Sequence, residues 1–318
     1  MKLLIVVVNY RTPDLAVDCL RTLSPEVESS QGTRVVVVEN ASGDDSASRI
    51  EAAVAANGWE GWVDLLPLDR NGGFAAGNNA AIGPALASGD PPDYVLLLNP
   101  DTLVRPGAVA TLLAFMDARP DVGLAGSRLD NPDGSLQASW FPFPSALREF
   151  ETRVCLRVVS RMLAGRFAPV DLPESPTGVD WVSGACLIAR RSVFETIGLL
   201  DDGFFMYFEE VDFCLRARRA GFACFFVPDA RVVHLVGRSS GVGAPDQRRK
   251  RLPGYWFLSR KRYYLKHHGR AGAAVANFSW VAGTLLMRVR RALTRTPDVA
   301  PAHFFRDFVR FNFLMAKQ

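Results

Sequence analysis

Short apolar runs alternate with helical segments along the first third of the chain. The runs are rich in valine, leucine and isoleucine, and continuous apolar runs of this length are typical of strands covered on both faces. They occupy residues 3–8, 34–38, 63–66 and 94–98, with helical patterns between them at residues 13–23, 44–56 and 75–87. This alternation predicts an α/β fold with a mostly parallel central sheet and helices on both faces.

The rest of the chain has a different pattern, with fewer strands and longer helices. We expect strands over residues 181–189, 222–227 and 231–235, and helices over residues 147–163, 211–220, 249–267, 271–295 and 302–316. A Gly/Ser-rich loop at 237–243 precedes the last three helices. The pattern therefore predicts a sheet-containing domain, residues 1–236, and a helical C-terminal region, residues 237–318.

Polar clusters follow each of the four early strands. They are Asn9-Tyr10-Arg11, residues 39–42, residues 70–73 and Asn99-Pro100-Asp101. In open parallel sheets, ligands bind at the carboxyl ends of the strands, where these clusters fall. Together they predict a crevice large enough for a nucleotide.

The composition supports a folded protein of a reducing compartment. Hydrophobic residues make up 48% and charged residues 22% of 318, which excludes a disordered or collagen-like chain. Five cysteines without a C-x-x-C pair predict buried thiols, not disulfides or a zinc site. The first apolar run has six residues, too few for a signal peptide, so we expect a cytoplasmic protein.

Charge is divided unevenly along the chain. Residues 1–236 hold 20 basic and 30 acidic residues, a net charge of −10, whereas residues 237–318 hold 17 basic and 3 acidic residues, a net charge of +14. This asymmetry predicts an anionic partner for the C-terminal region: a membrane surface, a phosphorylated ligand or nucleic acid. No recognised nucleic-acid-binding module is visible, so we expect no nucleic acid.

Residues 271–287 carry no charge, and arginines flank them. Three interpretations are open: a membrane-spanning helix at the lower limit of length, a helix lying on an anionic membrane surface, or packing in a soluble protein or a homo-oligomer. The arginines and phenylalanines that follow favour the membrane surface. We therefore expect peripheral binding to the inner face of the cell membrane through residues 270–318.

Two stretches carry candidate catalytic chemistry. Asp101 follows a buried strand, where its carboxylate suits Mg²⁺ or Mn²⁺, although it could also merely cap the next turn. Glu209, Glu210 and Asp212 follow five large apolar residues at a predicted helix start. Acids favour helix N-termini in any case, but a carboxylate beside apolar walls also has a raised pKa, as a general base requires. His234 lies at a strand end between apolar neighbours, where a ligand-binding histidine would be placed.

The loop at residues 70–79 resembles a phosphate-binding glycine loop but lacks a Walker lysine and the dinucleotide fingerprint.

Seven motifs that occur in order along the sequence make the chain resemble the family 2 inverting glycosyltransferases of the GT-A fold, most closely the bacterial rhamnosyltransferase-like members. The resemblance spans about residues 2–268. Its motifs are VVVNYR (6–11), VVVENASGDDS (36–46), NGGFAAGNN (71–79), LLLNPDT (96–102), SGACLIARR (183–191), FFMYFEEVDFCLRARRAGF (204–222) and VVHLVGRSSG (232–241).

The resemblance implies a Rossmann-like GT-A domain, with a nucleotide-sugar half at about 1–128 and an acceptor half at about 129–236. It implies metal-assisted single displacement with inversion, from a nucleotide-diphosphate sugar to a hydroxyl of a cell-surface glycan or lipid-linked saccharide. By analogy with the nearest-looking members, we expect dTDP-L-rhamnose as donor.

The resemblance also implies roles for individual residues. Asp101 and His234 would bind Mg²⁺ or Mn²⁺, Glu210 would be the catalytic base, and Glu209 and Asp212 would orient the acceptor or the base. The acceptor side would include Trp181, Ser183 and Gly184. Donor-binding residues would be Asn9, Arg11, Glu39, Arg70, Asn71, Gly73, Asn78, Asn99 and Asp101.

The sequence departs from the family pattern at two positions. Asn99 replaces the first acid of the metal motif, and Glu210 stands where many members have aspartate, which leaves Glu209 as an alternative base. Two other functions therefore stay open: a catalytically silent nucleotide-sugar-binding or scaffold protein, and a sugar nucleotidyltransferase. The second would favour an early Gly-rich loop with Arg and Lys, which the chain lacks after its first strand.

Overall fold

The computed structural model describes residues 1–154, 172–235, 250–296 and 300–315. It divides into two compact units. Unit 1 comprises Met1–Phe141, Asp171–Phe205 and Glu209–Gly241, and unit 2 comprises Pro142–Val170, Met206–Phe208 and Val242–Gln318. The domain boundary predicted at residue 236, and the donor and acceptor halves predicted before it, remain predictions.

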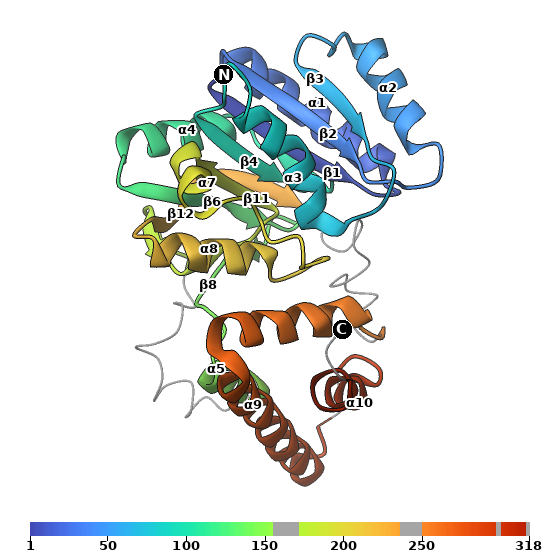
Figure 1. Cartoon of the computed structure of the whole chain (residues 1–318), viewed down its shortest axis with the longest axis vertical. Helices are drawn as coiled ribbons and strands as arrows, with labels where there is room; N and C mark the ends of the chain where they lie inside the picture. Colours follow the sequence, from blue (N-terminus) through green and yellow to red (C-terminus); the bar gives the residue numbers. More distant parts are fainter. Residues whose placement is uncertain (155–171, 236–249, 297–299, 316–318) are drawn as a thin grey trace. The chain divides into compact units, whose positions relative to one another are not determined.

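Unit 1 is built on a ten-stranded sheet (Figure 1). Eight strands lie in the order β3-β2-β1-β4-β11-β6-β12-β5, while β7 pairs with β6 and β9 with β12. Their bounds are β1 (Leu3–Asn9), β2 (Thr33–Glu39), β3 (Val63–Pro67), β4 (Tyr94–Leu98), β5 (Thr102–Val104), β6 (Val122–Asp130), β7 (Leu136–Gln137), β9 (Thr177–Val179), β11 (Cys186–Arg190) and β12 (Ala223–His234). A separate pair is formed by β8 (Trp140–Phe141) and β10 (Trp181–Val182).

Strand direction decides which residues meet at one edge of this sheet. β1 is parallel to β2 and β4, and β6 is parallel to β12, but β11 runs antiparallel to both β4 and β6. The carboxyl ends of β1, β2, β3, β4, β6 and β12 therefore share an edge with the start of β11. The prediction of a mostly parallel α/β sheet is confirmed.

Helices cover both faces of the sheet. On one face, Leu3, Ile5 and Val7 of β1 belong to a buried cluster with apolar residues of α1 (Pro13–Ser29), α2 (Ser46–Asn57) and α4 (Ala108–Ala118). On the other face lies α3 (Gly73–Leu86), whose Gly77 is so close to Val8 that an added Cβ would come within 2.9 Å of its Cγ1. α7 (Arg191–Ile197) and α8 (Glu209–Arg219) contact each other through Phe194 and Phe213.

The four early strands and the helices between them are confirmed to within a few residues, apart from a longer α1, but three later predictions were wrong. Residues 181–189 form two strands separated by a turn, and residues 223–234 form one strand, β12, with register shifts instead of two strands. β6 was not predicted, because Gly123 and Gly126 interrupt its apolar run. Both glycines are required, since a Cβ there would overlap Phe222 or Val182.

Other predictions fall partly outside the described residues. Of the helix expected at 147–163, the structure shows α5 (Ala146–Val154), and the loop at 237–243 lies outside the description. Cys19, Cys186, Cys214 and Cys224 are free and buried, as predicted, and Cys155 is not described.

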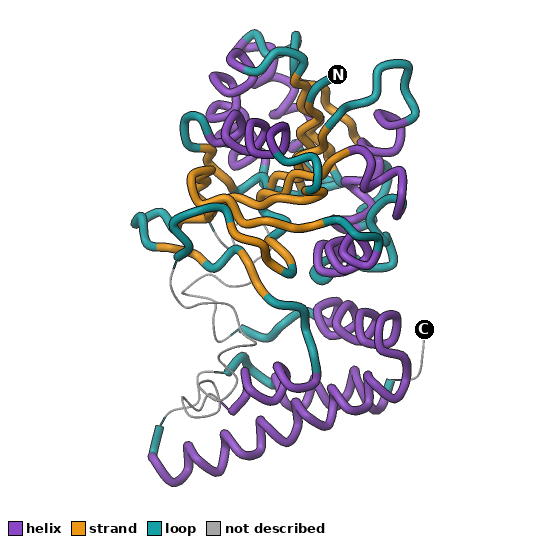
Figure 2. Tube along the Cα trace, turned by 90° about the vertical axis from the view of Figure 1, so that its left-hand side faces the viewer, coloured by secondary structure: helices purple, strands orange, loops and turns teal. Residues whose placement is uncertain are grey.

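Unit 2 is helical. α9 (Gly254–Thr294) contains a non-helical residue, Gly269, with φ 65° and ψ −174°, which divides it into two arms (Figure 2). These arms correspond to the two helices predicted at 249–267 and 271–295. The third predicted helix begins as α10 (Phe304–Val309) and ends as one π-helical turn, η3 (Arg310–Leu314).

The core of unit 2 combines stacked aromatic rings with a buried ion pair. The rings of Trp280 and Phe308 stack with centroids 3.6 Å apart. Arg260, 1% exposed, donates from Nε to Glu149 Oε1 at 2.9 Å and from a terminal nitrogen to Asn277 Oδ1 at 2.7 Å. Gly283 brings the second arm of α9 close to α5, because an added Cβ would lie 2.8 Å from the carbonyl oxygen of Phe150.

Candidate active site at the carboxyl edge of the sheet

The shared edge of the sheet brings together most of the predicted site. Asn9 and Glu39 end β1 and β2 and are direct partners in their register. Asn99 follows β4, and its N–H donates to the carbonyl of Ala185, just before β11, at 3.0 Å. The antiparallel direction of β11 thus places the segment predicted to face the acceptor beside the metal motif.

A buried serine links two predicted donor-binding residues. Glu39, 6% exposed, accepts hydrogen bonds from the N–H and the hydroxyl of Ser42. Arg11 donates from its backbone N–H to Ser42 Oγ at 2.8 Å and from Nε to the Ser42 carbonyl at 2.9 Å. Ser42 lay inside a quoted motif but had no predicted role. It fixes a carboxylate and an exposed guanidinium side by side, an arrangement suited to ribose hydroxyls and to an anion, respectively.

Asn9 has a local structural task at this edge. Its Oδ1 accepts hydrogen bonds from the N–H of Thr12 at 3.3 Å and from the Thr12 hydroxyl at 3.1 Å. Thr12 occupies the N-cap of α1, and its hydroxyl donates to Asn9 instead of capping the helix.

The glycine loop before α3 is organised by Asn40, a residue whose role the sequence did not reveal. Asn40 Nδ2 donates to Asn71 Oδ1 at 3.0 Å and to the Gly73 carbonyl at 3.2 Å. Gly73 has φ +88°, and an added Cβ would lie 1.9 Å from the carbonyl oxygen of Phe205. That carbonyl accepts a hydrogen bond from the N–H of Phe74 at 2.8 Å, so the loop and the approach to α8 are fixed together.

The other predicted residues of this loop differ in their surroundings. Arg70 is exposed at the end of β3. Asn78 is fully buried and donates to the carbonyl of Phe74 within its own helix at 2.9 Å. Its neighbour Asn79 instead makes two hydrogen bonds with the backbone of Leu200. The side chain of Asn78 therefore makes its hydrogen bond to the backbone of its own helix, α3.

Asp101 and His234 come together at this edge, as predicted for metal ligands. β5 begins immediately after Asp101 and pairs antiparallel with the end of β12, with His234 opposite Thr102. This pairing brings His234 Nε2 to 3.4 Å from both Asp101 Oδ1 and Asn99 Nδ2. Asp101 is 1% exposed, and the imidazole is also largely buried.

Gln137, which the sequence did not single out, contacts the other side of this imidazole. Its amide lies 3.0 Å from His234 Nδ1. The atom at this distance is the amide nitrogen Nε2. With the amide turned over, Oε1 accepts a hydrogen bond from Nδ1–H instead, and the lone pair of His234 Nε2 then faces Asp101 and can bind a cation. The Asp133-Gly134 pair, a strong hairpin signal, could have predicted the β6–β7 turn that delivers Gln137.

The chemistry of this cluster fits a divalent cation with incomplete protein ligation. A carboxylate, an imidazole and an amide oxygen are suitable donors for a hard or borderline cation. Within the described residues, no group of three His, Cys, Asp or Glu side chains converges on one point. Burial raises the pKa of the nearby Cys19 thiol to about 12, so this cysteine is neutral and a poor ligand at neutral pH.

The acids of α8 occupy different surroundings. Glu209 is 4% exposed and Glu210 is half-buried. A Cβ added to Gly184 would contact the Glu210 Cβ at 3.5 Å and the Phe74 ring at 3.6 Å. Gly184 therefore lies directly beside the Glu210 side chain and the Phe74 ring, so the predicted acceptor segment and the predicted base are neighbours.

Asp212 is fully buried and bound to Arg216 at 2.8 Å. Arg216 also donates to the carbonyls of Ile197 and Leu199, at 2.6 and 2.8 Å. Asp212 therefore orients Arg216, and Arg216 connects α8 to the end of α7 and the loop that follows it.

The remaining acceptor-side residues are held by the β8–β10 pair. Trp181 stacks on Phe141 with ring centroids 4.5 Å apart. The N–H of Ser183 donates to the carbonyl of Ser139 at 2.8 Å. These contacts fix the backbone that leads into Gly184.

Comparison with known proteins agrees with this geometry. The sequence pattern described as "Glycosyltransferase like family 2" matches residues 2–254. The chain belongs to this family. The family predicted from the motifs is therefore confirmed, over nearly the same range.

Similar proteins of this family include two rhamnosyltransferases. The chain is 35% identical over 188 residues to the N-acetylglucosaminyl-diphospho-decaprenol L-rhamnosyltransferase of Mycobacterium tuberculosis, covering 56% of this chain and 61% of that protein. It is 29% identical over 168 residues to the rhamnosyltransferase WbbL of Escherichia coli, covering 51% and 60%. The matches thus span about three-fifths of these relatives' length.

Solved structures share the fold at low sequence identity. GalNAc-T7 with UDP, GalNAc and Mn²⁺ aligns at a TM-score of 0.60 and 13% identity, covering 98% of this chain and 55% of that one. The mannosyltransferase PcManGT from Pyrobaculum calidifontis, with GDP-Man and Mn²⁺, aligns at 0.57 and 15%, covering 93% and 76%. The predicted GT-A fold is confirmed.

Proposed function

We propose that the chain is an inverting glycosyltransferase that moves L-rhamnose from dTDP-L-rhamnose to a hydroxyl of a cell-surface glycan or lipid-linked saccharide. One observation carries the proposal. The same sheet edge holds an Asp101–His234 pair suited to a cation and, beside Gly184, a separate carboxylate, Glu210, suited to a general base. A silent binding protein would not need the second group.

The proposed reaction is a single displacement. The acceptor oxygen bonds to the anomeric carbon as the bond from that carbon to the diphosphate breaks, and the hydroxyl proton passes to the Glu210 carboxylate. Attack from the face opposite the leaving group inverts the anomeric centre. In this proposal Arg11 and Glu39, both bound by Ser42, contact the nucleoside part of the donor, and the exposed Arg70 contributes to the same site.

Asp101, His234 and Asn99 would hold Mg²⁺ or Mn²⁺, which would supply positive charge against the departing diphosphate. Because the described residues supply two strong ligands, donor oxygens and water would complete the coordination. Cation and donor are therefore expected to bind cooperatively.

The names of the similar proteins support the donor and acceptor classes. Relatives from Mycobacterium tuberculosis, Escherichia coli and Shigella flexneri are all named as rhamnosyltransferases, the last with dTDP in its name. The first is named for a diphospho-decaprenol acceptor. We accordingly place the proposed acceptor on a lipid carrier and the protein peripherally on the inner face of the cell membrane.

A thermal-shift panel of dTDP, UDP, GDP and ADP, each with and without Mn²⁺ or Mg²⁺, tests the donor site. A nucleotide that binds only the folded state at about 100 times its Kd stabilises it by ~2.7 kcal/mol. We expect the largest shift with dTDP plus cation, its loss in Asp101→Ala, and its retention in Glu51→Ala, an exposed acid on α2. A preference for UDP or GDP would replace the donor, and no shift with any nucleotide would favour the scaffold protein.

A further inference from the structure

The second arm of α9 turns its apolar residues outward. Six large apolar side chains on it are exposed, from 45% for Leu286 to 81% for Leu293: Val275, Phe278, Leu285, Leu286, Val289 and Leu293. We call these six residues the apolar stripe. Soluble helices normally place such residues toward the core.

The six residues lie along one side of the helix. With 3.6 residues per turn, their spacing confines them to a sector of about 100°. The opposite side already fills the core of unit 2, because Ala276 and Trp280 are buried and Gly283 lies against α5. The stripe is therefore additional to the apolar surface that unit 2 needs to fold.

The charges on the second arm of α9 are all of one sign. Five arginines and no acidic residue occur from residue 270 to residue 296: Arg270, Arg288, Arg290, Arg291 and Arg295. A second copy of the same helix would bring these positive charges together, which argues against a self-association surface. An anionic surface complements them.

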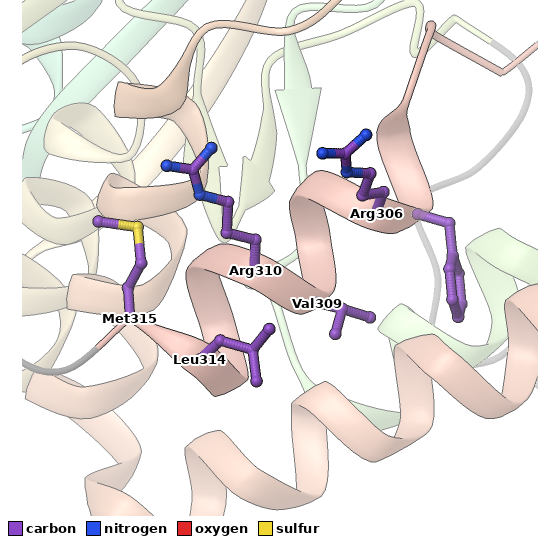
Figure 3. A pocket seen from close by; sticks show the side chains of 6 residues that line it. Arg306, Val309, Arg310, Leu314 and Met315 are labelled. Carbon is purple, nitrogen blue, oxygen red and sulfur yellow. The ribbon is translucent and has the colours of Figure 1, made fainter.

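The apolar surface continues onto the last helical turns. The ring of Phe313 contacts that of Phe278 with centroids 5.6 Å apart, and Leu314 is 74% exposed. A groove of about 710 Å³ beside them is lined by Phe305, Arg306, Val309, Arg310, Leu314 and Met315. Figure 3 shows the guanidinium groups of Arg306 and Arg310 pointing in the same direction, away from the side to which Val309 points.

We infer that the second arm of α9 lies flat in the headgroup region of an anionic phospholipid bilayer. The stripe enters the outer acyl region, and Arg270, Arg288 and Arg290, the arginines nearest to it around the helix, bind lipid phosphates. This mode suits a helix with apolar and cationic sectors, and each arginine near an anionic surface adds attraction. None of the described helices is both long and apolar enough to cross a bilayer. The inference uses none of the residues assigned to glycosyl transfer.

Flotation of the full chain with vesicles tests the inference. We expect binding to phosphatidylcholine vesicles that contain phosphatidylglycerol, and little binding to pure phosphatidylcholine. Leu286→Ser should weaken binding roughly tenfold or more, because one buried leucine is lost. Leu258→Ser, on the first arm and similarly exposed at 39%, is the matched control and should bind like the unaltered protein.

Charge and self-association are tested separately. Arg288→Gln with Arg290→Gln should weaken binding by roughly fivefold per arginine and make it less sensitive to salt. Equal binding to both vesicle types, or equal effects of Leu286→Ser and Leu258→Ser, would overturn the inference. So would a dimer in sedimentation that Leu286→Ser converts to monomer. Nucleotide-induced thermal shifts should be unchanged in every one of these variants, so failure here is distinguishable from failure of the proposed transfer.

Discussion

Units 1 and 2 depart in opposite ways from the usual distribution of side chains. In unit 1, polar side chains are buried: Asn9, Glu39, Asp101 and Asp212 are each 6% exposed or less. In unit 2, large apolar side chains are exposed along the second arm of α9. A buried polar group costs free energy unless it is hydrogen-bonded, as Glu39 is by Ser42 and Asp212 by Arg216, whereas a large exposed apolar surface marks a site of interaction.

The difference teaches where each kind of function comes from. In unit 1, the backbone pairing of six strand ends with the starts of β5 and β11 sets the positions of the candidate site residues. In unit 2, helical periodicity alone sets the surface, so one substitution changes it without moving the rest. We therefore expect the rate of sugar transfer to be sensitive to small changes of backbone geometry in unit 1. We expect membrane binding to be sensitive to the polarity of the exposed side chains in unit 2.

The largest expected effect is on the proposed base. Glu210→Gln should lower sugar transfer about a thousandfold, because an amide cannot accept the hydroxyl proton. The nucleotide-induced thermal shift should stay, since Glu210 lies on the acceptor side beside Gly184. Transfer assays with Glu209→Gln as the matched variant decide the assignment: loss in Glu209→Gln with near-normal transfer in Glu210→Gln would move the base by one residue.

The next largest effect is expected at Gly73, in the glycine loop before α3. Gly73→Ala should lower the free energy of unfolding by about 3 kcal/mol, from the left-handed φ and the overlap with the Phe205 carbonyl. Gly43→Ala, also at positive φ but with no atom within 4 Å, should cost only about 1 kcal/mol. Chemical denaturation measures both, and equal losses would show that the overlap relaxes at no cost.

A smaller effect is expected at Gln137. Removing its side chain should weaken Mn²⁺ binding about tenfold, because the His234 imidazole loses the partner that orients it. Titration of Mn²⁺ by electron paramagnetic resonance, with dTDP present, measures this without turnover. Gln137→Glu should restore affinity, since its carboxylate also accepts from Nδ1. Leu136→Ala, on the same strand, is the control, and unchanged affinity in Gln137→Ala would contradict the role.

The smallest expected effect is on the stability of unit 2 at low pH. Both terminal oxygens of Asp307 accept from Arg251 at 2.7 Å, and this arginine holds the pKa of Asp307 below its usual 3.8. The stabilisation is therefore complete above pH 3.8 and is lost as the pH falls through the folded-state pKa.

Asp307→Asn should cost about 1 kcal/mol at neutral pH, a modest value because Arg251 is half-exposed. Thermal melts across pH should show the difference from the unaltered chain shrinking in acid. A constant difference at every pH would show that charge is not its cause.

The sequence predicted the early half of the sheet because β1 to β4 are continuous apolar runs with polar residues at their ends. It also predicted the pairing of Asp101 with His234, although only through the family resemblance. It did not predict β6, because the glycines of this strand are required by side chains that are distant in the sequence. It also did not predict the roles of Asn40, Ser42 and Gln137. Those three residues act through partners far along the chain, Gln137 on His234 for example, and local patterns carry no signal for such contacts.

The antiparallel direction of β11 has a consequence for how such an enzyme can diversify. β6 ends at the site edge and β11 begins there, so the chain between residues 131 and 185 leaves and returns at the same edge. Lengthening a loop whose ends stay together costs little chain entropy. That excursion can therefore change in length beyond Gln137, which contacts His234, while the paired strands of the sheet keep their register.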